Sequence, residues 1–175
     1  MAQFDNDMVI TKAGVDLYNK VQAGLPLKFT KMAVGSGKLV DGDDPETFTE
    51  LKEHSFDAAI TSVTQNTQLQ VAVISGILNN DNITEGKYIC ELGLYADDPD
   101  VGEILYGYAN AGEKGDYIAP NNAGAFAWNY QVNAAIGNAI NVTATVSNTY
   151  FDYAIASTSS CLLYTSPSPR DVEES

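Results

Sequence analysis

The 175-residue sequence is poor in the residues from which many functional sites are built. It has one arginine, Arg170, one histidine, His54, and two cysteines, Cys90 and Cys161. Two cysteines are too few for a disulfide framework in a chain of this size, and their spacing does not match a metal motif. No run approaches the 18 apolar residues of a membrane-spanning helix. The first residues also lack the basic start and apolar stretch of a secretion signal, so we expect synthesis in a cytoplasm.

Positive charge is scarce as well. Nine Lys and Arg residues stand against 23 Asp and Glu residues, for a net charge of -14. Such an acidic surface repels phosphate groups at long range, and it repels anionic lipids for the same reason. We therefore expect neither a nucleic acid nor a membrane as a partner.

Catalytic and ligand-binding signatures are missing too. His54 lies in a polar stretch, and no Gly-x-Ser-x-Gly elbow accompanies it, which favours a surface histidine. Residues 35–38, Gly-Ser-Gly-Lys, lack the upstream glycine of a phosphate loop and read as a turn that ends a strand. The acidic run 41–46 lacks the glycine at position six of a calcium loop. The sequence thus predicts a non-enzymatic protein without cofactor or metal.

What the sequence does contain is one amphipathic helix followed by short alternating strands. Residues 11–23 predict the helix, with Thr11 as its cap and Ala13, Leu17 and Val21 on one apolar face. Gly24 and Pro26 end it. The hydrophobic content of 45% is sufficient for one domain with its own core.

The rest of the domain has the period of two that is typical of strands. We expect strands at 27–34, with a bulge between Phe29 and Met32, then at 58–64 and 69–78, where Leu69, Val71 and Val73 share a face. A hairpin is expected to join Tyr88, Cys90, Leu92 and Leu94 to Ile104, Tyr106 and Tyr108, and residues 111–125 are expected to be a loop. Residues 126–132 and 140–146 complete the strands. The fold class is therefore α+β, mainly β: an N-terminal helix followed by an antiparallel sandwich or open barrel.

Three segments carry a family resemblance. Residues 10–14 and 27–37, Ile-Thr-Lys-Ala-Gly and Leu-Lys-Phe-Thr-Lys-Met-Ala-Val-Gly-Ser-Gly, form the first block. Residues 91–96 and 102–108, Glu-Leu-Gly-Leu-Tyr-Ala and Gly-Glu-Ile-Leu-Tyr-Gly-Tyr, form the second, and residues 137–144, Gly-Asn-Ala-Ile-Asn-Val-Thr-Ala, form the third. Together they resemble the N-terminal domain of phage tail-collar and tail-fibre proteins, of the type found in phages of Gram-positive bacteria.

The resemblance implies a structural role in a virion tail. Such domains anchor a fibre to the baseplate and so support host attachment. The implied partners are baseplate or tail proteins, the implied assembly is a homotrimer, and the implied site of synthesis is the bacterial host cytoplasm. Cys90 departs from the family pattern, in which arginine often precedes the glutamate, so an Arg–Glu pair with Glu91 is missing.

Aromatic side chains on the predicted strands are candidates for the contact surface, because such rings bury much area and keep a polar group. The candidate interface residues are Tyr95, Tyr106, Tyr108, Trp128 and Tyr130, with Tyr88 and Tyr117 as further rings. The alternative is that most of them are core residues, since aromatics favour strands in any case.

The C-terminal residues have a different character. Residues 161–171, Cys-Leu-Leu-Tyr-Thr-Ser-Pro-Ser-Pro-Arg-Asp, resemble the translation of a transposase adapter used in sequencing libraries. We therefore expect residues 1–150 to be the attachment domain, 151–160 the start of a truncated downstream region, and 161–175 an adapter-derived, disordered segment of a metagenomic fragment.

Two other functions remain open at this stage. Exposed Trp128 and tyrosine rings would suit a carbohydrate-binding module. A fibre-borne glycan hydrolase would need two carboxylates in one cleft, for which Glu91 and Asp97 are a possible pair.

Overall fold

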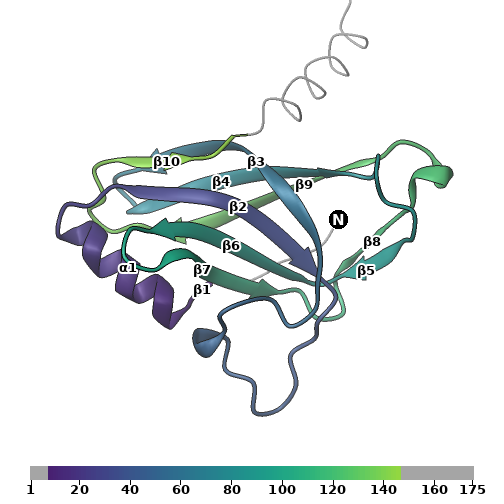
Figure 1. The fold of residues 1–175 in the computed structure, drawn as a ribbon, viewed down its shortest axis with the longest axis horizontal. Helices are drawn as coiled ribbons and strands as arrows, with labels where there is room; N and C mark the ends of the chain where they lie inside the picture. The colour runs from purple at the N-terminus through teal and green to yellow at the C-terminus, as the bar shows by residue number, and fades with distance from the viewer. Residues whose placement is uncertain (1–7, 147–175) are drawn as a thin grey trace, which may run out of the picture.

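A computed structural model describes residues 8–146 as one sheet curled into a half-barrel, with a helix beside it. This confirms the predicted class, mainly β with an N-terminal helix (Figure 1). The helix α1 is Lys12–Gln22, and the short 3-10 helices η1 and η2 are Pro45–Thr47 and Asn121–Ala123. The strands are β1 Val9–Ile10, β2 Leu27–Gly35, β3 His54–Asn66, β4 Val71–Asn79, β5 Lys87–Ile89, β6 Glu91–Asp98, β7 Gly102–Asn110, β8 Asp116–Ile118, β9 Ala127–Ala135 and β10 Val142–Ala144.

Helix α1 begins where the sequence predicts. The Thr11 hydroxyl accepts a hydrogen bond from Gly14 N at 3.0 Å, as an N-cap does. Leu17 and Val21 point into the core, whereas Ala13 is only half-buried. Gly14 is the third buried position, and a Cβ there would lie 2.3 Å from the Tyr106 carbonyl oxygen. Only a glycine allows the helix to pack this closely on β7.

The sheet has the strand order β1-β7-β6-β2-β3-β4-β9. Its pairs are antiparallel except that β10 runs parallel to β2. Strand β2 holds β10 along residues 27–29 and β3 along residues 32–35, so β10 fills the wedge that opens as β3 curls away. The predicted bulge in β2 is present, since the register with β6 shifts between Phe29 and Lys31.

Val71 and Val73 share one face of β4, as predicted, and this is the outer face of the sheet. Leu69 precedes the strand and is 70% exposed, and Val71 and Val73 are half-buried on the outer face. Ala72, Ile74 and Gly76 face the core instead, as do their partners on β9. The small inward residues have a packing reason, because a Cβ on Gly76 would lie 2.5 Å from Met32 Sδ.

The predicted hairpin forms between β6, with Leu92 and Leu94, and β7. Tyr88 lies instead in β5, which pairs with β8, and Cys90 lies between β5 and β6. Strand β7 also does not keep one face along its length. Its register with β6 passes from Leu94–Gly107 directly to Tyr95–Leu105. Tyr106 is the extra residue at this irregularity, so it points to the face opposite Tyr108. The predicted common face of Tyr106 and Tyr108 was wrong for this reason.

The region predicted to be a loop, residues 111–125, contains a strand and a short helix. Strand β8 pairs with β5 in a two-stranded ribbon, with Tyr88 opposite Tyr117. This ribbon projects beyond the main sheet at the right of Figure 1. A three-residue strand such as β8 is too short to show a period, which is why the sequence did not predict it.

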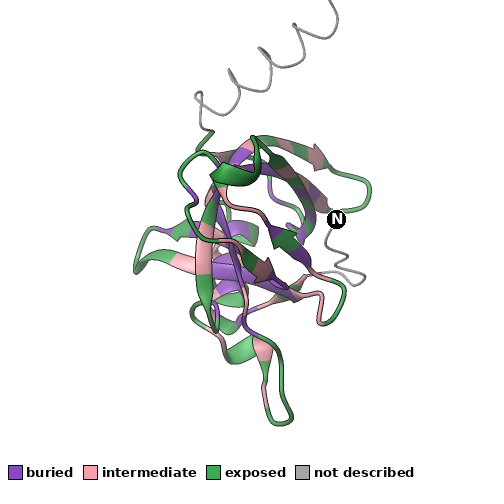
Figure 2. Ribbon diagram, turned by 90° about the vertical axis from the view of Figure 1, so that its right-hand side faces the viewer, coloured by how far each residue is buried: buried purple, intermediate pink, exposed green. Residues whose placement is uncertain are grey.

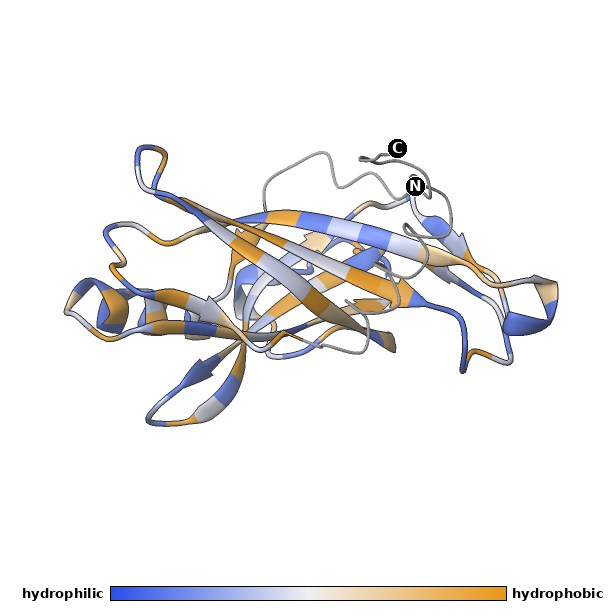
Figure 3. Cartoon of the chain, turned by 90° about the horizontal axis from the view of Figure 1, so that it is seen from above, coloured by the Kyte–Doolittle hydropathy of each residue, from blue (hydrophilic) through white to orange (hydrophobic). Residues whose placement is uncertain are grey.

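Two hydrophobic clusters hold the sheet, one on each face. The larger one fills the concave side and includes Leu17, Phe29, Ile74 and Tyr130. The smaller one, Ala33, Leu51, Leu105 and Tyr108 with Phe48 and Tyr95 beside it, lies under the segment that joins β2 to β3. Figure 2 shows the buried positions along the strand centres, and Figure 3 shows apolar and polar bands alternating along the strands.

Some predictions fall on residues outside the described range. The truncated region 151–160 and the adapter-like segment 161–175, which contains Cys161 and Arg170, belong to this group. Within residues 8–146, no helix has the length and apolarity needed to cross a membrane.

Candidate functional site

Three of the five candidate interface residues lie in the interior. Tyr106 and Tyr108 are each 1% exposed and Tyr130 is 3% exposed. Burial raises the pKa of each phenol above its ordinary value. These rings cannot contact a partner while the domain is folded, so they are core residues rather than interface anchors.

The other two candidates are half-buried. Tyr95 lies in the smaller cluster with Lys31 Nζ 4.9 Å from its ring centre, and burial raises the pKa of its phenol. Trp128 packs against the main core and meets Phe126 at a centroid distance of 6.1 Å. Among residues 8–146, the most exposed aromatic rings are those of Tyr117, at 61%, and Phe126, at 47%.

A buried carboxylate lies at the start of β6, where it accepts several hydrogen bonds. Glu91 is 0% exposed and accepts hydrogen bonds from three backbone amides: Gly37 N at 3.0 Å, Lys52 N at 3.1 Å and Glu53 N at 2.7 Å. Tyr108 donates its hydroxyl to the same carboxylate at 2.7 Å. A carboxylate is acceptor-only, and four converging donors suit it. The long β2–β3 segment is thereby tied to the sheet at both of its ends.

The position before Glu91 holds Cys90, and the geometry needs no cation there. The carboxylate is satisfied by amides and a phenol, so it requires no cation from the neighbouring position. Cys90 uses that position as a buried free thiol, 3.1 Å from the Gly37 carbonyl oxygen, and burial raises the pKa of the thiol. The sequence feature that could have predicted the burial of Glu91 is its position between the apolar residues Ile89 and Leu92.

The proposed hydrolase pair does not meet in space. Glu91 starts β6 and Asp97 lies six residues along the same strand. At about 3.4 Å per residue, the two are separated by roughly 20 Å. Paired glycosidase carboxylates stand about 5 to 10 Å apart. Glu91 is also enclosed and saturated, so this pair cannot act on a glycan.

A second buried polar side chain organises the loop after β8. Asn80 is 0% exposed, and its Nδ2 donates to the carbonyls of Ala119, Pro120 and Gly124 at 2.8 to 3.2 Å. Its Oδ1 accepts from Phe126 N at 2.9 Å. The sequence suggested only a polar turn here, because a single asparagine among asparagines carries no pattern.

Several charged side chains near the surface form pairs. His54 is exposed and contacts Asp57 at 2.9 Å, in keeping with a surface histidine. Lys52 pairs with Asp43, and its hydrogen bond lowers the pKa of that carboxyl. Within residues 8–146, no three His, Cys, Asp or Glu side chains gather as a metal site would require.

One ion pair fastens α1 to the β6–β7 turn. Lys20 Nζ lies 2.8 Å from both oxygens of Asp98 and 2.8 Å from Asp100. The hydrogen bond from Lys20 lowers the pKa of Asp98. Hydrogen bonds to Asp100 and Asp98 raise the pKa of Lys20 in turn. The cluster is structural, since Lys20 and the two carboxylates are paired with one another.

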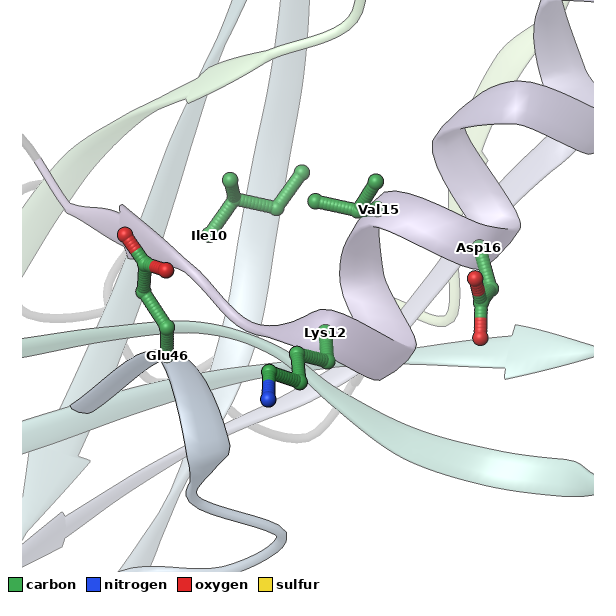
Figure 4. A pocket seen from close by; sticks show the side chains of 5 residues that line it. All are labelled: Ile10, Lys12, Val15, Asp16 and Glu46. Atoms are coloured by element: carbon green, nitrogen blue, oxygen red, sulfur yellow. The ribbon is translucent and has the colours of Figure 1, made fainter. Parts of the chain in front are cut away.

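Two open pockets lie at the ends of α1. The first, of about 380 Å³, is lined by Ile10, Lys12, Val15, Asp16 and Glu46 (Figure 4). Its polar side chains are exposed, and they do not converge on one point. The second, of about 220 Å³, lies between the end of α1 and the β9–β10 turn and includes Leu25 and Ile140. Neither has the enclosed polar centre that is typical of a small-molecule site.

Comparison with protein-family models, with curated proteins and with solved structures found no match to this chain.

Proposed function

We propose that this domain is a structural module of a phage or prophage tail. It anchors the N-terminal end of a tail fibre to the baseplate and has no catalytic activity. The observation that supports this best is that the three sequence blocks of the family resemblance, far apart in the chain, become direct neighbours in the fold.

The first and second blocks meet at the start of α1. Thr11 N donates to the Tyr106 carbonyl at 3.1 Å, and the Thr11 hydroxyl donates to the Leu105 carbonyl. Gly14 supplies the room for this approach, as its Cβ space is filled by the Tyr106 carbonyl. The threonine and glycine of the helix block therefore have a shared physical purpose, which is to seat α1 on the β7 bulge.

The other contacts join the blocks in the same way. The Glu91 carboxylate of the second block binds the Gly37 amide of the first. Leu27 N of the first block donates to the Asn141 carbonyl of the third at 2.9 Å, and β10 pairs with β2 from there. Motifs that hold elements of the fold together in this way suit a structural module, whereas a catalytic centre would place its motif side chains in a cleft.

Binding to neighbouring tail proteins tests the proposal. The chain would be co-expressed with each tail protein encoded beside its gene, and we expect one of them to co-purify with it as a stable complex. The full set of neighbours is the control, because a specific anchor selects one partner. A chain that binds none of them would contradict the proposal, and so would turnover of host wall polymers by the purified chain.

A carbohydrate-binding module is the second candidate, because Tyr117 and Phe126 expose their rings. Aromatic faces of this kind stack on sugars in such modules. Glycan-array binding that is lost in Phe126→Ala or Trp128→Ala would favour it. Phe126→Ala is the sharper variant, since Trp128 also packs against the core.

A further inference from the structure

A tight turn at residues 40–43, Val-Asp-Gly-Asp, lies in the exposed segment between β2 and β3. Asp43 N donates to the Val40 carbonyl at 3.1 Å, and Gly42 has a φ of +95°. A positive φ at the third residue alone is characteristic of a type II turn, which favours glycine at that place. The turn therefore puts a residue without a side chain directly after Asp41.

The pair Asp41–Gly42 is also the only place in the 175-residue sequence where an aspartate or asparagine precedes a glycine. An aspartate carboxyl can close a five-membered ring on the backbone nitrogen of the next residue, and a side chain on that residue hinders the approach. Gly42 offers no such hindrance, since no atom lies within 4 Å of the place where its Cβ would be. Both residues are exposed, so water reaches the pair.

The two groups that would react are free, whereas the neighbouring carboxylate is not. The Asp43 carboxylate accepts from Val40 N at 2.8 Å and pairs with Lys52. Within residues 8–146, neither the Asp41 carboxylate nor Gly42 N makes a hydrogen bond or an ion pair. No contact has to be broken before the Asp41 side chain turns toward Gly42 N.

We propose that Asp41–Gly42 is a site of spontaneous modification, at which the backbone rearranges from aspartate to isoaspartate. Gly42 N attacks Asp41 Cγ and gives up its proton, the carboxyl gives up an oxygen, and one water leaves as a cyclic imide forms. Water then adds to the main-chain carbonyl of the ring and breaks its bond to Gly42 N. The chain now runs through Cβ and Cγ of Asp41, and the former main-chain carbonyl is a carboxylate.

The rearrangement conserves atoms and charge. The water that is lost in the first step returns in the second, and one carboxylate is present before and after. The reaction needs no oxidant, cofactor or enzyme. The proposal stands on the turn alone and does not rest on the proposed attachment role.

The product cannot keep the contacts that close the turn. Two hydrogen bonds join Val40 to Asp43 across the reacting pair, and an extra main-chain carbon inserted between them separates their partners. Asp43 then moves away from Lys52, the ion pair that links the turn to the far end of its own segment. We therefore expect the modified β2–β3 segment to open locally, while the strands of the sheet stay paired.

Peptide mapping of the stored 175-residue chain tests the modification. The chain would be kept at body temperature and neutral pH for several weeks and then digested with trypsin, which cuts after Lys38 and Lys52. We expect a second form of peptide 39–52 to accumulate, with unchanged mass, a different elution time and reactivity toward an isoaspartyl methyltransferase. Peptide 39–52 that stays in a single, unreactive form would overturn the proposal.

Two variants and one internal control locate the reaction. Asp41→Glu would have to close a six-membered ring, so the second form should be lost. Asp41→Asn releases ammonia, a better leaving group than the oxygen of a carboxylate, and should react faster than the parent. Asp81 is the control, because it is equally exposed in a turn but precedes Asn82. A second form that persists in Asp41→Glu would overturn the proposal, and so would equal reaction at Asp81.

Hydrogen exchange followed by mass spectrometry tests the structural consequence. Amides of residues 39–52 should exchange faster in the stored parent than in the fresh parent, to an extent that follows the fraction of isoaspartate. Exchange in β6 and β7 should be unchanged, and stored Asp41→Glu should behave as the fresh chain does. Unchanged exchange in residues 39–52 of the modified chain would overturn the local opening, and so would faster exchange throughout the sheet.

Discussion

The sheet has a neutral half without charged side chains, made of β4, β9, β10 and the part of β3 from Ala58 onward, and a charged half made of β2, β6 and β7. In each half one fully buried polar side chain holds a long connecting segment in place, and the two side chains have opposite hydrogen-bonding roles. In the charged half, Glu91 collects backbone N–H groups from the β2–β3 segment. In the neutral half, Asn80 collects backbone carbonyls from the segment between β8 and β9. Both side chains are 0% exposed.

The difference follows from which backbone groups the segment leaves unpaired. Three amides and a phenol require a group that only accepts, and a carboxylate has four lone-pair positions to offer. Three carbonyls and one amide require a group that donates and accepts, which an asparagine amide does without charge. The comparison shows that each half satisfies its buried backbone with the side chain of matching polarity, so that the neutral half needs no charge even in its interior.

The largest expected effect is that of Glu91→Gln. The glutamine NH2 group would replace one carboxylate oxygen and face either the amides of Gly37 and Glu53 or the amide of Lys52, so at least one buried donor would lose its acceptor. We expect the free energy of unfolding, measured by urea denaturation, to fall by about 3 kcal/mol or more. Glu103→Gln, at an exposed position of β7, is the control and should change it little. A loss below about 1 kcal/mol for Glu91→Gln would contradict the role of the carboxylate as a hub.

Asn80→Ala should have the next largest effect on the free energy of unfolding. It removes the donor for three carbonyls and the acceptor for Phe126 N, and we expect a loss of about 2 kcal/mol in the same assay. Asn80→Asp should be worse than the alanine variant, because a carboxylate would face the same carbonyls. Asn82→Ala, in the neighbouring exposed turn, serves as the reference. If Asn80→Asp matched the parent, the polarity rule drawn from the comparison would fail.

Tyr106→Phe removes a hydrogen bond between the two halves, and the expected loss of stability is smaller. The Tyr106 hydroxyl donates to the Ala135 carbonyl at 2.6 Å, which joins β7 of one half to β9 of the other. We expect a loss of about 1 kcal/mol, typical of one buried hydrogen bond. Thermal unfolding followed by circular dichroism would measure it, with Tyr117→Phe as the exposed control. Equal effects of the two variants would argue against the link.

The smallest effect is the pH dependence of Lys20–Asp98, which belongs to the charged half alone. Because the pKa of Asp98 is lowered in the fold, its contribution to stability is present above the ordinary carboxyl pKa of 3.8 and is lost as pH falls through the lower value. Asp98→Asn should therefore be less stable than the parent at pH 6, and the difference should shrink toward pH 2.5. A difference that stays constant over that range would exclude the ion pair as its cause.

Local signals in the sequence were reliable where neighbours along the chain decide the structure. The Thr11 cap, the bulge after Phe29 and the β6–β7 hairpin were all predictable from residues within a few positions of each other. Other features depend on a distant contact, which local signals do not show. The face of β4 depends on Met32 lying against Gly76, and the side to which Tyr106 points depends on an irregularity against β6.

The sequence by itself determined the class of fold, the N-terminal helix and the strongly acidic character, because these depend on composition and on short-range periodicity. It also contained the two charge-free stretches, 58–80 and 117–146, as separate parts of the chain. Only the tertiary structure decided that they lie side by side as one half of the sheet, and that Glu91 and Asn80 are enclosed rather than exposed. Pairing of β4 with β9 brings together residues 48 to 64 positions apart, and no local pattern carries that information.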